Sequence, residues 1–130
     1  RHFCLVPLGR FFEPCWETGK AVPWSIHRQD GEPFTVAGIW DRWNDRATGE
    51  IVVSFSMLTI NADGHPIMGR FHRPGDERRS LVVVPPSRWT DWLSATPDTV
   101  RAMLAEMPVA EFTSESVMGL SSAPAQASFL

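Results

Sequence analysis

The stretch from Asn61 to Val84, NADGHPIMGRFHRPGDERRSLVVV, constrains the fold more than any other part of the chain. It lies between two apolar runs, residues 51–60 and 81–84. Its glycines and prolines exclude a long helix, because glycine costs backbone entropy and proline lacks an amide donor. Its histidines and arginines are His65, His72, Arg70, Arg73, Arg78 and Arg79. Two interpretations follow: a cationic loop that presents chemistry from a rigid frame, or a solvated loop whose arginines pair with its own acids.

Length and composition narrow the class of protein. The 130 residues, 43% of them hydrophobic, predict one soluble globular domain. No apolar run approaches the roughly 18 residues that span a bilayer, and no signal peptide is evident, so no membrane association is expected. Two cysteines favour a reduced, cytoplasmic setting, or a nucleoid-associated one if the protein is bacterial. The start on Arg1, directly before an apolar segment, suggests a fragment or a processed chain.

Charge favours a local anionic partner rather than a coat of nucleic acid. The net charge is −3, which opposes bulk binding of a polyanion. Lys20 is the only lysine among twelve cationic side chains, and arginine prefers planar contacts to phosphate or carboxylate. A basic groove on one part of the surface is therefore compatible with the composition.

Apolar runs and turn signals predict several strands. Residues 3–7 and 10–14 are expected to be extended, and Asp30-Gly31 between 22–28 and 34–40 predicts a β-hairpin. A polar turn at 44–49 leads into a long strand at 50–60, which we expect to be buried on both faces over part of its length.

The periodicity changes after residue 84. A short helix is expected from Pro85, with Trp89, Trp92 and Leu93 on one face. Thr96-Pro97 predicts a second helix, whose apolar stripe is Val100, Met103, Leu104 and Met107. The expected fold is α+β: a curved, mainly antiparallel, barrel-like sheet with two short helices toward the C-terminus. Residues 1–113 would form the domain and 114–130 a loosely ordered tail.

Three residues are candidates for chemistry or base stacking, and the sequence speaks against a zinc site. Glu13 follows two phenylalanines, so partial desolvation would raise its pKa and suit acid–base work; otherwise it points outward from an edge strand. Trp40 and Trp43 are candidates for stacking on a base, or for the core. The cysteines and histidines lack the paired spacing of a zinc site, so no metal or cofactor is expected.

Three segments in order resemble one family. CLVPLGRFFEP (4–14) is similar to the "RCLVPADGFYEW" stretch of the SOS-response-associated peptidase (SRAP) family, the abasic-site processing proteins. PFTVAGIWDRW (33–43) resembles its "AGLWE.W" segment, and residues 57–84 resemble its "T..AN......IH.RMPVIL" segment with an insert after the histidine. The helix at 89–93 falls where the family has "WL".

The resemblance implies binding to single-stranded DNA that carries an abasic site. In the family, an N-terminal cysteine forms a Schiff base with the abasic aldehyde and closes a thiazolidine crosslink, and self-cleavage frees that cysteine. Glu13 and His72 match the family's proton-transfer residues, with His65 as the competitor of His72. Arg79 matches the arginine that contacts phosphate, with Arg73 as its alternative. These roles are of peptidase and DNA-lyase type.

The chain departs from the family at its start. The "MCGR" beginning has no counterpart, and Cys4 and Cys15 are internal, so the chain is expected to lack the crosslinking nucleophile. The first hypothesis is the C-terminal part of a monomeric abasic-site sensor. The second is a catalytically inactive single-stranded-DNA-binding module that uses Arg70, Arg73, Arg78 and Arg79. The third is a nonfunctional remnant that does not fold alone.

Overall fold

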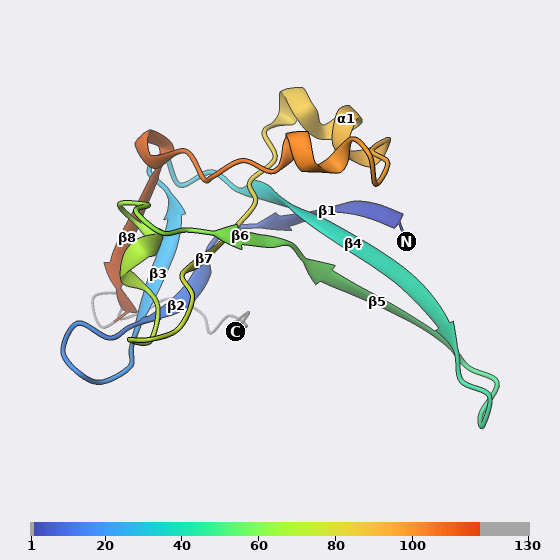
Figure 1. Cartoon of the computed structure of the whole chain (residues 1–130), viewed down its shortest axis with the longest axis horizontal. Helices are drawn as coiled ribbons and strands as arrows, with labels where there is room; N and C mark the ends of the chain where they lie inside the picture. Colours follow the sequence, from blue (N-terminus) through green and yellow to red (C-terminus); the bar gives the residue numbers. More distant parts are fainter. Residues whose placement is uncertain (1, 118–130) are drawn as a thin grey trace.

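The computed structural model describes residues 2–117, which form three antiparallel sheets (Figure 1). The first sheet has the order β1-β4-β5, from strands β1 (His2–Leu8), β4 (Phe34–Asn44) and β5 (Ile51–Met57). The second has the order β2-β3-β8, from β2 (Phe11–Cys15), β3 (Val22–Arg28) and β8 (Phe112–Ser116). The third pairs β6 (Thr59–Asn61) with β7 (Arg79–Leu81). The antiparallel pairing is confirmed, but these sheets do not close into a barrel.

The hairpin predicted at Asp30-Gly31 is wrong. A turn is present, since Gly31 N–H donates to the Arg28 carbonyl and Gly31 has a φ of 76°. The strands on either side of it nevertheless belong to different sheets. Both edges of β3 are occupied, one by β2 and the other by β8, so β4 has no free edge of β3 to pair with.

The expected strand at 50–60 is divided, and its burial was predicted wrongly. β5 leaves β4 at the pair Gly38–Met57, and Leu58 N–H then donates to the Ala37 carbonyl at 2.9 Å. The chain next pairs with β7 as β6. We call residues 40–55 the β4–β5 arm, because this part extends beyond the rest of the fold (Figure 1). Strand β5 is exposed along nearly its whole length, and within residues 2–117 its one strand partner is β4.

Residues 2–117 contain one α-helix where two helices were expected. Helix α1 (Trp89–Leu93) follows the 3₁₀ turn η2 (Pro86–Arg88) and packs on β1. The second predicted helix is only the 3₁₀ turn η3 (Val100–Met103), after which Leu104 is extended. The reason is tertiary, because Met107 enters the core instead of continuing a helical stripe.

Two further 3₁₀ turns complete the described elements. Turn η1 (Met68–Arg70) lies in the loop between β6 and β7, and η4 (Val109–Glu111) directly precedes β8. The tail predicted from residue 114 begins inside β8, which pairs with β3 as far as Ser116. Residues 118–130, the rest of that predicted tail, lie outside the described residues.

Two apolar clusters stabilise the fold. The larger one lies between the second sheet and the inner ends of β4 and β7; its most buried aromatic members are Phe11, Phe34, Phe71 and Phe112. The smaller one lies under α1, where Trp92 is fully buried and its Nε1–H donates to the Cys4 carbonyl at 2.8 Å. Burial of so large a side chain contributes about 3 kcal/mol or more, so α1 is held by Trp92 rather than by helix propensity.

Candidate active site

The loop between β6 and β7 is fastened to the core by His65. Its Nδ1 accepts hydrogen bonds from the amides of Ile67 and Met68, at 3.2 and 3.1 Å. Its Nε2–H therefore donates to the Met107 carbonyl, at 2.8 Å. The ring is 3% exposed and both of its nitrogens are used, so His65 has a structural role.

Glu13 is buried in the middle of β2. Its side chain is on the same face of the second sheet as Phe11 and Cys15, and it pairs across the strands with Trp24. Oε2 is buried and receives no hydrogen bond within residues 2–117. Burial raises the pKa of Glu13 from 4.5 to about 8, as the flanking aromatics predicted. At neutral pH the carboxyl group therefore holds its proton and can act as an acid.

His72 follows η1 and retains an unused donor. Its Nε2 accepts the Arg79 amide hydrogen at 2.7 Å, so a neutral ring carries its proton on Nδ1. Nδ1 is buried and meets no acceptor at hydrogen-bonding geometry among the described residues. Burial lowers the pKa of His72, although the Met68 backbone opposes the shift. The neutral ring thus presents an Nδ1–H group that forms no well-aligned hydrogen bond among the described residues, although the Met68 backbone interacts with the ring.

Trp24 links the two sides of this site. It is the cross-strand neighbour of Glu13, and its ring lies 5.8 Å from that of Phe71, the residue before His72. The Arg70 guanidinium lies over the same Trp24 ring at 4.6 Å. One aromatic side chain therefore joins the β2–β3 hairpin, which carries Glu13, to the loop, which carries His72.

The arginines of the loop differ in how far they are already paired. Arg70 forms a bidentate pair with Glu17, at 2.7 and 3.2 Å, and this hydrogen bonding lowers the pKa of the Glu17 carboxyl. Arg79 binds Glu77 at 2.9 Å and Thr59 at 2.8 Å. Arg73 forms no ion pair within residues 2–117, and its guanidinium lies 5.5 Å from the Trp16 ring. Arg73 is thus the loop arginine with most capacity for an added anion.

Arg78 agrees with the second interpretation from the sequence, a loop whose arginines pair with its own acids. Its Nε–H donates to the Gly69 carbonyl at 2.9 Å, and its guanidinium is 3.9 Å from Asp63. Arg79 with Glu77 follows it as well, whereas Arg70 pairs with an acid outside the loop. Both interpretations therefore hold in part, residue by residue.

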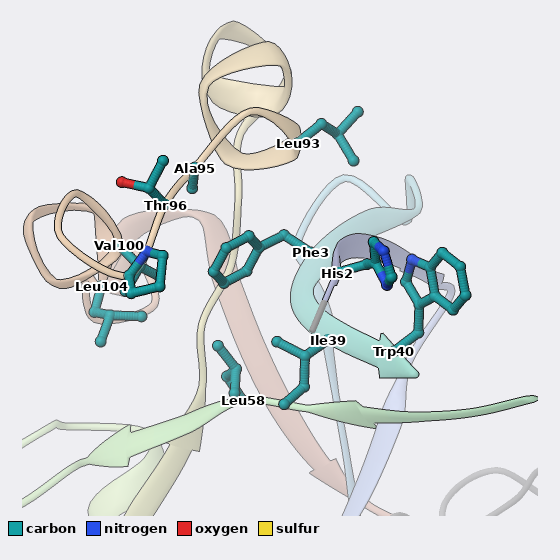
Figure 2. Close-up of a pocket in the computed structure, with 11 residues that line it drawn as sticks. His2, Phe3, Ile39, Trp40, Leu58, Leu93, Ala95, Thr96, Val100 and Leu104 are labelled. Carbon is teal, nitrogen blue, oxygen red and sulfur yellow. The ribbon is translucent and has the colours of Figure 1, made fainter. Parts of the chain in front are cut away.

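Trp40 and Trp43 are not brought together with these residues. They lie on the β4–β5 arm, which projects away from the loop (Figure 1). Trp40 stacks on His2 with ring centroids 4.3 Å apart, and both line an apolar cavity of about 840 Å³ under α1 (Figure 2). His2 is the one charged or titratable side chain in that lining, so the cavity offers few groups for acid–base chemistry.

Sequence reasoning missed the aromatic and acidic residues that support the site. The Arg70 guanidinium lies over the Trp24 ring, and the Arg73 guanidinium lies over the Trp16 ring. Glu17 accepts a hydrogen bond from Arg70, which is 53 residues later in the sequence. A Trp-Glu pair after the strand that bears Glu13 was the available signal, but nothing local connects it to the loop. No cluster of three or more metal-ligating side chains occurs in the described part, nor any helix there that could cross a membrane.

Comparison with known proteins assigns the chain to a family. A crystal structure of a protein from Bordetella bronchiseptica is 39% identical, with a TM-score of 0.84 over 89% of this chain and 55% of that one. A crystal structure from Bacteroides thetaiotaomicron has the same fold, at 24% identity and a TM-score of 0.74 over 89% of this chain and 49% of that one. The chain thus spans about half the length of these structures. No curated protein matches it. The model of the SOS response associated peptidase (SRAP) family matches residues 1–120, so the chain belongs to this family, whose function is associated with DNA damage.

Proposed function

We propose that the site around Glu13 and His72 supplies proton transfer for the processing of abasic sites in single-stranded DNA. The observation that carries this proposal is that Glu13 Oε2 and His72 Nδ1 are both buried and form no hydrogen bond among residues 2–117. Trp24 connects the segments that carry them, because it pairs with Glu13 across the strands and its ring contacts Phe71, the residue before His72. Buried polar groups are normally satisfied, and those that are not need an explanation. A carboxyl group held neutral and a histidine held neutral are suited to proton exchange at an imine.

The family resemblance supplies the chemistry that these residues would assist. An amine adds to the ring-opened aldehyde to give a carbinolamine, which loses water to form the Schiff base. Protonated Glu13 would give its proton to the departing hydroxyl group, and the carboxylate would recover a proton from the attacking amine. The thiol sulfur then adds to the imine carbon while the thiol proton passes to the imine nitrogen, which closes the thiazolidine. His72 Nδ1–H would donate to an oxygen of the opened sugar.

The nucleophile in this proposal is neither cysteine of the present sequence. Cys4 lies within β1, and burial raises the pKa of its thiol, which lowers its thiolate fraction. Cys15 is buried at the end of β2. Neither residue can offer an α-amine beside its thiol, because both have peptide bonds at their nitrogens. The amine and thiol would come from an N-terminal cysteine, as in the family.

The DNA backbone would lie along the arginines of the loop. Arg73 is the first candidate for a phosphate contact, because it has no acidic partner among residues 2–117. Arg70 and Arg79 would bind phosphate by exchanging part of their present pairing with Glu17 and Glu77. Such contacts predict an affinity that falls steeply with salt.

A binding module without catalysis is the second candidate function. It is favoured by the same arginines, and it needs neither Glu13 nor His72. It predicts equal affinity for intact and abasic single strands, whereas the first candidate predicts a preference for the lesion.

A crosslinking assay separates these candidates. The chain, and a version extended upstream to begin Cys-Gly-Arg, would be incubated with an abasic single-stranded oligonucleotide and resolved on a denaturing gel. The extended version should give a heat-stable shifted band, and Glu13→Gln should slow its formation about 10²-fold or more. The matched control Glu32→Gln removes an exposed carboxyl group and should leave the rate unchanged. Absence of a band from the extended version would refute the abasic-site proposal.

Native-gel binding of the same oligonucleotides tests the DNA surface. Arg73→Ala should weaken binding and reduce the salt slope by about one, since one phosphate contact is removed. Arg101→Ala, in η3 on a different part of the fold, is the matched control. Equal losses in the two variants would contradict a phosphate contact at Arg73.

A further inference from the structure

Strand β5 is an open edge of the first sheet. Within residues 2–117 it pairs with β4 alone, so the backbone groups on its other side meet no strand. An exposed edge of this kind is a template for another strand unless charge, proline or a bulge blocks it. The sequence of β5, IVVSFSM, contains neither a charged residue nor a proline.

The same strand has an exposed apolar face. Strand alternation places Ile51, Val53 and Phe55 together on one side, and they are 61%, 64% and 59% exposed. The antiparallel register adds Trp40, because it pairs with Phe55. Trp40 also stacks on His2 (Figure 2). We call Ile51, Val53, Phe55 and Trp40 the arm stripe. Single exposed apolar residues are ordinary, but a contiguous stripe marks an interaction surface.

The composition of the arm favours a polypeptide over DNA as its partner. Residues 41–50, DRWNDRATGE, contain two arginines and three acids, so their net charge is −1 and gives no attraction for a polyanion. Two of the four stripe residues are aliphatic and offer no stacking platform. An apolar edge strand instead suits β-augmentation, in which main-chain hydrogen bonds give affinity and alternate side chains give specificity.

We propose that the arm stripe and the free edge of β5 dock a further polypeptide segment, of the kind that longer family members carry outside the part matched by this chain. The Bordetella bronchiseptica chain aligns with 89% of this one over only 55% of its own length, so it contains more polypeptide than this fold accounts for. The added segment pairs with β5 as a strand, and its alternate apolar side chains cover Ile51, Val53 and Phe55. This inference does not depend on the proposed chemistry, because the stripe lies away from Glu13 and His72.

The test co-expresses the whole present chain with the unmatched part of the Bordetella bronchiseptica chain as a separate polypeptide. We expect a one-to-one complex, with hydrogen exchange slowed at residues 51–57. Val53→Asp should weaken the complex at least about tenfold, as for a central interface residue. Val52→Asp is the matched control, because it makes the same change one residue away on the opposite face; it should weaken the complex less than about threefold.

Three outcomes would overturn the proposal. They are the absence of a complex, a complex whose protection from hydrogen exchange lies outside β5, and an equal loss of affinity in the two aspartate variants. A concentration-dependent dimer of the present chain that Val53→Asp abolishes would assign the stripe to a second copy. Slowed exchange at residues 51–57 on adding single-stranded DNA alone would assign it to DNA. Exchange on the unsubstituted complex needs no variant, so a folding defect in either aspartate variant leaves the test intact.

Discussion

Glu13→Gln should stabilise the protein at neutral and alkaline pH while it impairs proton transfer. The folded-state pKa of Glu13 is about 8, against 4.5 for an exposed glutamate. The folded state therefore holds the proton more tightly than the unfolded state. The stability linked to this group is complete below pH 4.5, and it is lost as the pH rises through 8. Glutamine has the same shape and cannot ionise, so the variant escapes this loss.

The expected size follows from linkage. At pH 7 the unfolded chain has ionised and the folded chain has not, which costs the unsubstituted protein about 3 kcal/mol of stability. Above pH 8.5 the cost approaches its full value of about 5 kcal/mol. The variant should therefore unfold at higher denaturant concentration than the unsubstituted protein at pH 7 and 9, and the two should coincide near pH 4.

The measurement is denaturant unfolding at pH 4, 7 and 9, followed by tryptophan fluorescence. Glu32→Gln removes an exposed carboxyl group and provides the control for loss of one negative charge. A stability difference for Glu13→Gln that stays constant from pH 4 to pH 9 would refute the reasoning, because burial of an ionisable group must give a pH-dependent term. A destabilised variant at pH 9 would show that the carboxylate has a partner.

Three further predictions concern single positions. His65→Ala should cost about 2–4 kcal/mol, because it leaves two amides and the Met107 carbonyl unpaired, and denaturant unfolding with His72→Ala as the milder comparison checks it. Gly38→Ala should cost about 1–3 kcal/mol, because its Cβ would lie 2.9 Å from Cys4 Sγ and 3.1 Å from the Ser56 carbonyl oxygen; a melting temperature equal to that of the unsubstituted chain would contradict this. Trp92→Leu should cost about 3 kcal/mol through lost packing and the lost bond to the Cys4 carbonyl, and exposed Trp89→Leu should cost less by the same thermal assay.

Local signals predicted the individual strands well and their partners poorly. Strand β3 has the bounds expected from its sequence, 22–28, because a run of apolar residues between turn signals is sufficient to define it. Its pairing could not be predicted in the same way. The second edge of β3 is occupied by β8, which lies more than 80 residues later in the chain. The Asp-Gly signal gives a turn, but it cannot report that both neighbouring edges are already used.

In the candidate site, too, features set by neighbouring residues could be predicted and features set by distant contacts could not. The raised pKa of Glu13 follows from its immediate neighbours, so the sequence could predict it. The identity of Trp24 as the residue between Glu13 and the loop could not be predicted, because it depends on the register of β2 with β3 and on a contact with Phe71. The exposure of β5 was missed for a related reason: apolar alternation reports the need for burial, not whether the described fold supplies a cover.

The two histidines of the loop show how structure resolves a choice that sequence left open. A loop rich in glycine and proline does not hold a catalytic group in place by itself, so something must fix it to the core. His65 does so, with two amide hydrogen bonds and one to the Met107 carbonyl. Its ring has no nitrogen left for a substrate. Within residues 2–117 the well-aligned hydrogen bond of the His72 ring is at Nε2, which accepts from the Arg79 amide and so directs the proton to Nδ1. The division of roles makes His72 the residue to test for chemistry, and it makes His65 the residue whose loss would disorder the site first.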